Sequence, residues 1–170
     1  NATDLYNSTP FAFTPFFFHG VCSELSSVRV ADAVAASMAV PVMFRPVLMR
    51  TEPRACPGPP DWTARVLADR DEFENVRQTA RAFQNYRGDT RAAQTSLHLV
   101  DGGVADNLGL LSLQVLRAAE GSPSPLTRDE ALQARRVLLL VVNAEYIRPR
   151  TFQQNDTDAV SGYEMLYSPL

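Results

Sequence analysis

The chain has 170 residues, of which 45% are hydrophobic, and this length suits one domain with a hydrophobic core. Its formal net charge of -3 at pH 7 shows no basic excess, which argues against a nucleic-acid-binding surface. No apolar run approaches the roughly 20 residues that a membrane-spanning helix needs.

Two features of the residue usage bear on the origin of the chain. All 16 basic residues are Arg, which we interpret as the coding bias of a GC-rich, bacterial genome. The sequence opens on Asn1 without an initiator Met, and we expect it to be part of a longer polypeptide. A bacterial, membrane-associated or cell-envelope location is expected, although no signal sequence is present in these residues.

The two cysteines, Cys22 and Cys56, are far apart and lack the spacing of a zinc site. They are either reduced core thiols or one disulfide of an exported protein. We therefore expect no zinc site at these cysteines.

The first half of the chain predicts strands and helices in turn. The aromatic run Phe11–Phe18 suits a strand with a break at Pro15. Residues Val28–Met38 predict a helix with an apolar stripe at helical spacing, which Pro41 ends. Extended chain is expected at Val42–Leu48, and a helical pattern follows over Trp62–Tyr86.

The second half predicts a strand, a loop and a helix around Asp101. The apolar residues before Asp101 predict the strand, and residues Leu110–Ala119 predict the helix. A short helix near Thr127–Ala134 and a buried strand at Val137–Val142 are expected further on. Strands alternating with helices predict an α/β sheet that is covered on both faces.

The loop after the predicted strand reads Asp101-Gly102-Gly103 and is a candidate site. Ligands and chemistry collect at the carboxyl ends of strands in open α/β sheets. The two glycines let the loop take positive φ and let another backbone approach closely. By themselves, these residues are more typical of a simple turn or helix cap than of a functional site.

A second stretch of the sequence favours the interpretation of this loop as a functional site. The hexapeptide Ala-Ser-Met-Ala-Val-Pro at residues 36–41 precedes the Asp-Gly-Gly loop and Asn107. In this order and spacing the motifs resemble the patatin-like phospholipase family. The resemblance implies a three-layer α/β/α sheet with helices on both faces, present as a partial domain lacking its N-terminal part. Residues 1–147 would belong to the catalytic domain, and residues 148–170 would be a tail or its continuation.

The resemblance implies a lipid acyl hydrolase, of phospholipase A or esterase type, that uses a Ser-Asp dyad and needs no metal and no organic cofactor. Asp101 would be the base. The nucleophilic Ser of a G-x-S-x-G elbow and the glycine-rich oxyanion loop would lie upstream of Asn1, since neither motif occurs in this sequence. The expected partner is a lipid or phospholipid at a membrane surface, with no nucleic acid involved. The alternative is a catalytically inactive patatin-like module that binds lipid or protein.

The histidines and their positions in the sequence also favour Asp101 as the direct base. A serine hydroxyl needs a base to take its proton, and in α/β-hydrolase triads a His follows the Asp in the chain. No His follows Asp101, while His98 is expected to point to the opposite face of the strand, and His19 could approach only through the fold. A free Asp has a pKa near about 3.9, and removal from water at a strand end would raise it.

The neighbouring residues are expected to support the loop. Gly102 and Gly103 would provide the loop geometry that lets the base meet the nucleophile. Asp106 and Asn107 more often cap a helix and brace a loop than touch substrate. A Ca²⁺ loop at Asp101 and Asp106 is not supported, because the D-x-D-x-D spacing is missing.

Overall fold

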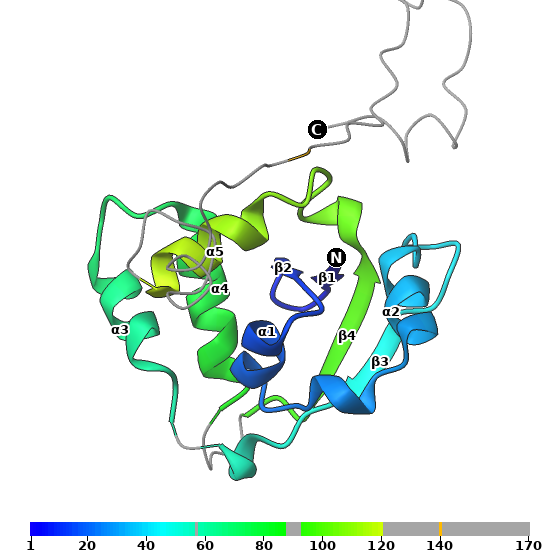
Figure 1. The fold of residues 1–170 in the computed structure, drawn as a ribbon, viewed down its shortest axis with the longest axis horizontal. Coiled ribbons are helices and arrows are strands. Elements are labelled where there is room, and N and C mark those ends of the chain that lie inside the picture. Colours follow the sequence, from blue (N-terminus) through cyan, green and yellow to red (C-terminus); the bar gives the residue numbers. More distant parts are fainter. Residues whose placement is uncertain (57, 88–92, 121–139, 141–170) are drawn as a thin grey trace, which may run out of the picture.

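The computed structural model describes residues 1–56, 58–87, 93–120 and 140, and it contains both helices and strands (Figure 1). Short 3-10 turns, labelled η, connect several of these elements. In chain order the elements are β1 (Ala2–Asp4), β2 (Thr9–Phe11), α1 (Pro15–Gly20), η1 (Leu25–Ser27), α2 (Val30–Ser37), β3 (Val47–Arg50), η2 (Pro53–Ala55), α3 (Asp61–Ala68), α4 (Glu74–Asn85), β4 (Ser96–Asp101), η3 (Gly102–Val104) and α5 (Leu111–Glu120).

The four described strands form one sheet in the order β2-β1-β4-β3, and every neighbouring pair is antiparallel. β1 pairs with the end of β4, so that Ala2 lies opposite Asp101 and Asp4 lies opposite Leu99. The fold is therefore broadly α/β, as predicted, and its described strands are antiparallel. Asp101 stands at the end of a central strand.

The core lies on one face of this sheet. Leu97 and Leu99 of β4 are fully buried, in one cluster with Phe17 of α1, Ala36 of α2 and Val115 of α5. Successive side chains of a strand point to opposite faces, so His98 belongs to the other face. Leu48, which pairs with His98, is 59% exposed. The described helices thus share one core, and the described part of the chain leaves the opposite face of the sheet in part uncovered.

The strand predicted over Phe11–Phe18 is wrong beyond Phe11. β2 ends at Phe11, and α1 begins at Pro15. Proline is favoured in the first turn of a helix, where its missing N–H leaves no hydrogen bond unmade. The helix turns Phe17 and Phe18 into the core, where both rings lie edge-on to Phe11.

The helix predicted over Val28–Met38 is present as α2, but its apolar stripe is not buried. Ala36 is the only residue of α2 that is buried. Extended structure was predicted over Val42–Leu48, whereas β3 begins only at Val47, after a turn closed by the Phe44 N–H to the Val40 carbonyl oxygen at 3.0 Å.

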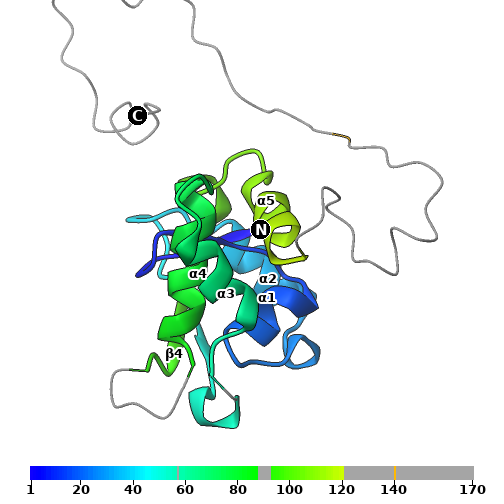
Figure 2. The same cartoon turned by 90° about the vertical axis from the view of Figure 1, so that its left-hand side faces the viewer.

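The pattern over Trp62–Tyr86 forms two helices, α3 and α4, which lie side by side (Figure 2). The Asp69 carboxylate accepts the Asp71 N–H at 2.9 Å, which favours a turn over continued helix. The strand before Asp101 and the helix after it are confirmed as β4 and α5. The elements predicted at residues 127–134 and 137–142 lie outside the described residues apart from Leu140, and the tail from 148 lies wholly outside them.

Candidate functional site

Three hydrogen bonds hold Asp101 at the end of β4. Its N–H donates to the Ala39 carbonyl oxygen at 2.9 Å, and its carbonyl oxygen accepts the Thr3 hydroxyl at 2.8 Å. Its carboxylate accepts the Gly103 N–H on Oδ1 at 2.7 Å. Asp101 taken as a whole residue is half-buried, and within the described part of the chain the second oxygen of its carboxylate, Oδ2, has no hydrogen-bond partner. One oxygen is therefore fixed while the other remains able to accept a proton.

The two glycines after Asp101 are sites of close approach, as predicted, but the positive φ expected of them is wrong, because neither residue has it. A Cβ on Gly102 would lie 2.7 Å from the Asn1 carbonyl oxygen, a distance that backbone atoms cannot accommodate without moving. A Cβ on Gly103 would lie 3.1 Å from Asp101 Oδ1 and 3.2 Å from Asn107 Oδ1. Side chains at these positions would displace Asn1 or press on the carboxylate.

Asp106 makes the contacts of a helix cap. Its buried carboxylate accepts the N–H of Leu110 at 3.0 Å and that of Leu111 at 2.8 Å. These N–H groups lie at the start of α5, where they lack intrahelical partners. Asn107 is exposed, and its Oδ1 lies beside Gly103. Both residues thus border the Asp101 loop.

The described residues do not bring a nucleophile to Asp101. No hydrogen bond among them joins its carboxylate to a serine or a histidine. Ser37 lies half-buried in α2, and Ser112 is buried near the start of α5 with its hydroxyl unpartnered. His98 packs against the Tyr6 ring with centroids 4.7 Å apart, and the His19 carbonyl oxygen accepts a hydrogen bond from Arg87.

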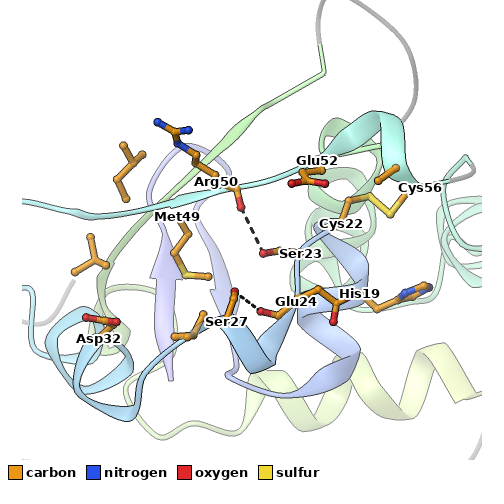
Figure 3. Close-up of a pocket in the computed structure, with 14 residues that line it drawn as sticks. His19, Cys22, Ser23, Glu24, Ser27, Asp32, Met49, Arg50, Glu52 and Cys56 are labelled. Carbon is orange, nitrogen blue, oxygen red and sulfur yellow. Dashed lines mark hydrogen bonds between the residues drawn. A yellow bond between two sulfur atoms is a disulfide. The ribbon is translucent and has the colours of Figure 1, made fainter.

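A cavity of about 790 Å³ opens elsewhere, between β3 and the residues around η1 (Figure 3). Three carboxylates, those of Glu24, Asp32 and Glu52, line it. The Arg29 guanidinium bonds Asp32 at 2.8 Å and holds the pKa of that carboxyl below its usual value. Asp101 does not line this cavity, so the cavity is separate from the candidate base.

The cysteines form a disulfide at one end of that cavity. Cys22 and Cys56 are bonded, with Cα atoms 5.8 Å apart (Figure 3). Of the two states that the sequence left open for the cysteines, reduced or bonded, the structure has the bonded one. The bond ties the end of α1 to the residues after η2.

A buried polar network around Asp4 was missed by the sequence reasoning. The Tyr86 hydroxyl donates to Asp4 Oδ2 at 2.8 Å, and Asn7 Nδ2 donates to the same oxygen at 2.6 Å. Burial raises the pKa of Tyr86, and the charge of Asp4 and the hydrogen bond to it raise it further. Asn7 also bonds Gln94 at 3.0 Å, so the network joins the β1–β2 turn to the end of α4 and the start of β4. No local sequence pattern marks contacts between such distant residues.

Three further observations concern metals, membranes and relatives. Among the described residues, no group of three or more His, Cys, Asp or Glu side chains could hold a metal ion. Within the same ranges no helix has the length and apolar character to cross a membrane. Comparison with family models, curated proteins and solved structures found no match to the chain.

Proposed function

We propose that this chain carries the base of a serine lipid acyl hydrolase, of phospholipase A or esterase type. Asp101 is the base of a Ser-Asp dyad, and the serine and oxyanion loop belong to polypeptide that precedes Asn1. The complete domain is a three-layer patatin-like fold. The observation that carries the proposal is the state of the Asp101 carboxylate, whose Oδ1 is held by the Gly103 N–H at 2.7 Å while Oδ2 has no partner among the described residues.

The proposed dyad works by proton transfer through Oδ2. As the serine Oγ bonds to the acyl carbon, its proton passes to Asp101 Oδ2 and then to the departing alcohol oxygen. In the second half of the reaction water attacks the acyl carbon, its proton passes to Asp101 Oδ2 and then to the serine Oγ, and the carboxylic acid leaves. The Gly103 hydrogen bond keeps the carboxylate in one orientation, and this orientation sets the position of Oδ2.

Supporting contacts hold Asp101 in place without touching the substrate. The bonds from Asp101 N–H to Ala39 and from Thr3 to the Asp101 carbonyl oxygen fix its backbone. Asp106 fixes the start of α5, which follows the loop. These are positioning roles, and the proposed substrate is a lipid ester at a membrane surface.

The test is hydrolysis of a short-chain nitrophenyl ester by the full-length encoded protein, with wild type beside Asp101→Asn. We expect the variant to lose turnover by on the order of 10⁴-fold, the loss that follows replacement of a triad Asp. Circular dichroism confirms that the variant is folded. Asp71→Asn is the matched control, because Asp71 is exposed in the turn between α3 and α4 and activity should remain.

Two outcomes would contradict the proposal. Equal turnover by wild type and Asp101→Asn removes Asp101 from the mechanism. Absence of turnover in both favours the second candidate, a catalytically inactive module that binds lipid or protein. Exposed apolar side chains next to the Asp101 loop, such as Val104 at 58% exposure, favour such a binding role.

A further inference from the structure

Asn107 is an exposed polar residue close to the candidate base. It lies in the segment that connects β4 to α5 (Figure 1). The carboxylate of its neighbour Asp106 bonds N–H groups at the start of α5, whereas the Asn107 side chain makes no hydrogen bond with the described residues. Within this part of the chain, the Asn107 carboxamide is therefore available to a ligand.

The Asn107 side chain and the Asp101 carboxylate lie on the same side of Gly103. A Cβ on Gly103 would lie 3.1 Å from Asp101 Oδ1 and 3.2 Å from Asn107 Oδ1, so both oxygens border the same point. Because glycine has no side chain, no atom of residue 103 separates the two groups there. A ligand atom that bonds the second carboxylate oxygen of Asp101 would have the Asn107 carboxamide as a polar neighbour.

The proposed reaction brings the leaving alcohol to this position. Asp101 Oδ2 gives its proton to the departing alcohol oxygen, so that oxygen has to come within about 2.6–3.2 Å of Oδ2. A group beside the Asp101 carboxylate therefore faces the alcohol half of the ester, whereas the far end of the acyl chain lies on the other side of the reacting carbon. Asn107 has the position of a group that contacts the alcohol.

The charges of the segment favour an uncharged partner for Asn107. Asp101 and Asp106 are carboxylates, and among the described residues neither forms an ion pair with an Arg. A phosphate group would therefore meet like charges without a counter-ion, which is unfavourable. A carboxamide is neutral and has one acceptor oxygen and two N–H donors. A hydroxyl group both donates and accepts, so it matches the carboxamide better than a phosphate does.

Exposed apolar side chains lie in the same segment as Asn107. Val104 is 58% exposed and Leu108 is 46% exposed. An ester with a hydrocarbon chain could cover these two side chains while a hydroxyl of its alcohol bonds Asn107. The segment therefore suits an amphiphilic ester, in agreement with the class of substrate proposed above.

We propose that Asn107 binds a hydroxyl group of the leaving alcohol and thereby discriminates esters of polyols from esters of simple alcohols. This inference rests on the proposed function, because it takes Asp101 as the group that protonates the leaving oxygen. Asn107 is a substrate-binding residue in this scheme. Its carboxamide bonds a hydroxyl on the carbon next to the one that carries the scissile oxygen, and a simple alcohol leaves the carboxamide without that bond.

The test compares two soluble esters that differ only in the hydroxyl groups of the alcohol. Glycerol 1-monobutyrate and propyl butyrate have the same acyl chain and the same carbon skeleton in the alcohol. Both are assayed with the full-length encoded protein and with its Asn107→Ala variant. We expect the variant to lower kcat/KM for the glycerol ester roughly three- to tenfold, the range that one hydrogen bond supplies. The propyl ester should be hydrolysed as well as by the wild type.

Leu108→Ala is the matched control. It shortens a partly exposed side chain next to Asn107 and removes no side-chain hydrogen bond, so it should change kcat/KM for both esters by the same factor. Asn107→Ala should keep the melting temperature of the wild type, because the side chain that it removes is exposed. Equal losses on the two esters in Asn107→Ala, or no loss on the glycerol ester, would contradict the proposal.

Failure of the dyad and failure of the hydroxyl contact give different results. Full turnover by Asp101→Asn, together with a loss confined to the glycerol ester in Asn107→Ala, would reject the dyad and retain the contact.

If the protein hydrolyses neither ester, binding is measured directly by NMR. The side-chain NH₂ signals of Asn107 are followed as glycerol is added, with propanol as the control. A shift with glycerol alone supports the contact. Equal shifts with both alcohols, or none, overturn it. A shift with glycerol 3-phosphate and none with glycerol would assign the carboxamide to an anion and also overturn the proposal.

Discussion

The Asp101 N–H donates to the Ala39 carbonyl oxygen at 2.9 Å, which joins the end of β4 to the end of α2. This bond brings together the two sequence motifs, residues 36–41 and the Asp-Gly-Gly loop. The motifs lie far apart in the chain, and neither one predicts contact with the other by itself. Because the two motifs are in contact, the end of α2 lies beside the candidate base.

Gly102→Ala should destabilise the protein. The added Cβ would lie 2.7 Å from the Asn1 carbonyl oxygen, and overpacking of this kind costs about 1–3 kcal/mol. Urea unfolding measures the change in the free energy of unfolding. Gly58→Ala is the control, because among the described residues, apart from its chain neighbours, no heavy atom lies within 4 Å of its Cβ position. Equal stability of the two variants would show that the β1 end moves freely away from the loop.

Asp106→Ala should weaken the start of α5. Removal of its carboxylate leaves the N–H groups of Leu110 and Leu111 without their acceptor, and loss of such a cap costs about 0.5–2 kcal/mol. Thermal unfolding followed by circular dichroism measures the loss. Asp106→Asn keeps one of the two acceptor oxygens and should recover part of the loss, whereas a stability equal to that of Asp106→Ala would contradict a cap made by these hydrogen bonds.

Tyr86→Phe should change stability and its dependence on pH. Loss of the hydroxyl removes a hydrogen bond to the buried Asp4 carboxylate, at a cost of about 1–3 kcal/mol. Burial raises the pKa of Tyr86 in the folded state above the unfolded value of about 10. Its contribution is therefore fully present below pH 10 and is lost as the pH rises above that value.

Unfolding measured from pH 8 to pH 11 checks this sign. The wild type should lose stability more steeply above pH 10 than Tyr86→Phe does, because only the wild type has this proton to release on unfolding. Parallel curves for the two proteins would mean that the Tyr86 hydroxyl titrates alike in both states.

Reduction of the Cys22–Cys56 bond should lower the melting temperature. The cysteines are 34 residues apart, and closing a loop of that length stabilises a protein by about 2–4 kcal/mol. Calorimetry with and without dithiothreitol measures the effect. The double variant Cys22→Ser/Cys56→Ser should melt at the reduced temperature and should not respond to dithiothreitol. A response in that variant would assign the effect to something other than this bond.

Local features of the chain were predictable from its sequence. The apolar run before Asp101 forms β4, the glycines make the turn, and the residues after them form α5. The capping role of Asp106 at the start of that helix was also predictable, because a cap bonds N–H groups only a few residues away. Hydrophobic period and turn chemistry are short-range, so a single sequence contains them.

Tertiary structure alone decided which distant residues meet. Phe11–Phe18 has the composition of a strand, yet packing of Phe17 and Phe18 into the core favours a helix from Pro15. The periodicity of α2 predicts its helix, but that pattern does not reveal which face remains exposed. The disulfide, the Asp4–Tyr86 bond and the antiparallel order of the sheet join residues far apart in the chain. Such pairings depend on the burial that the whole fold achieves, which no short stretch of sequence encodes.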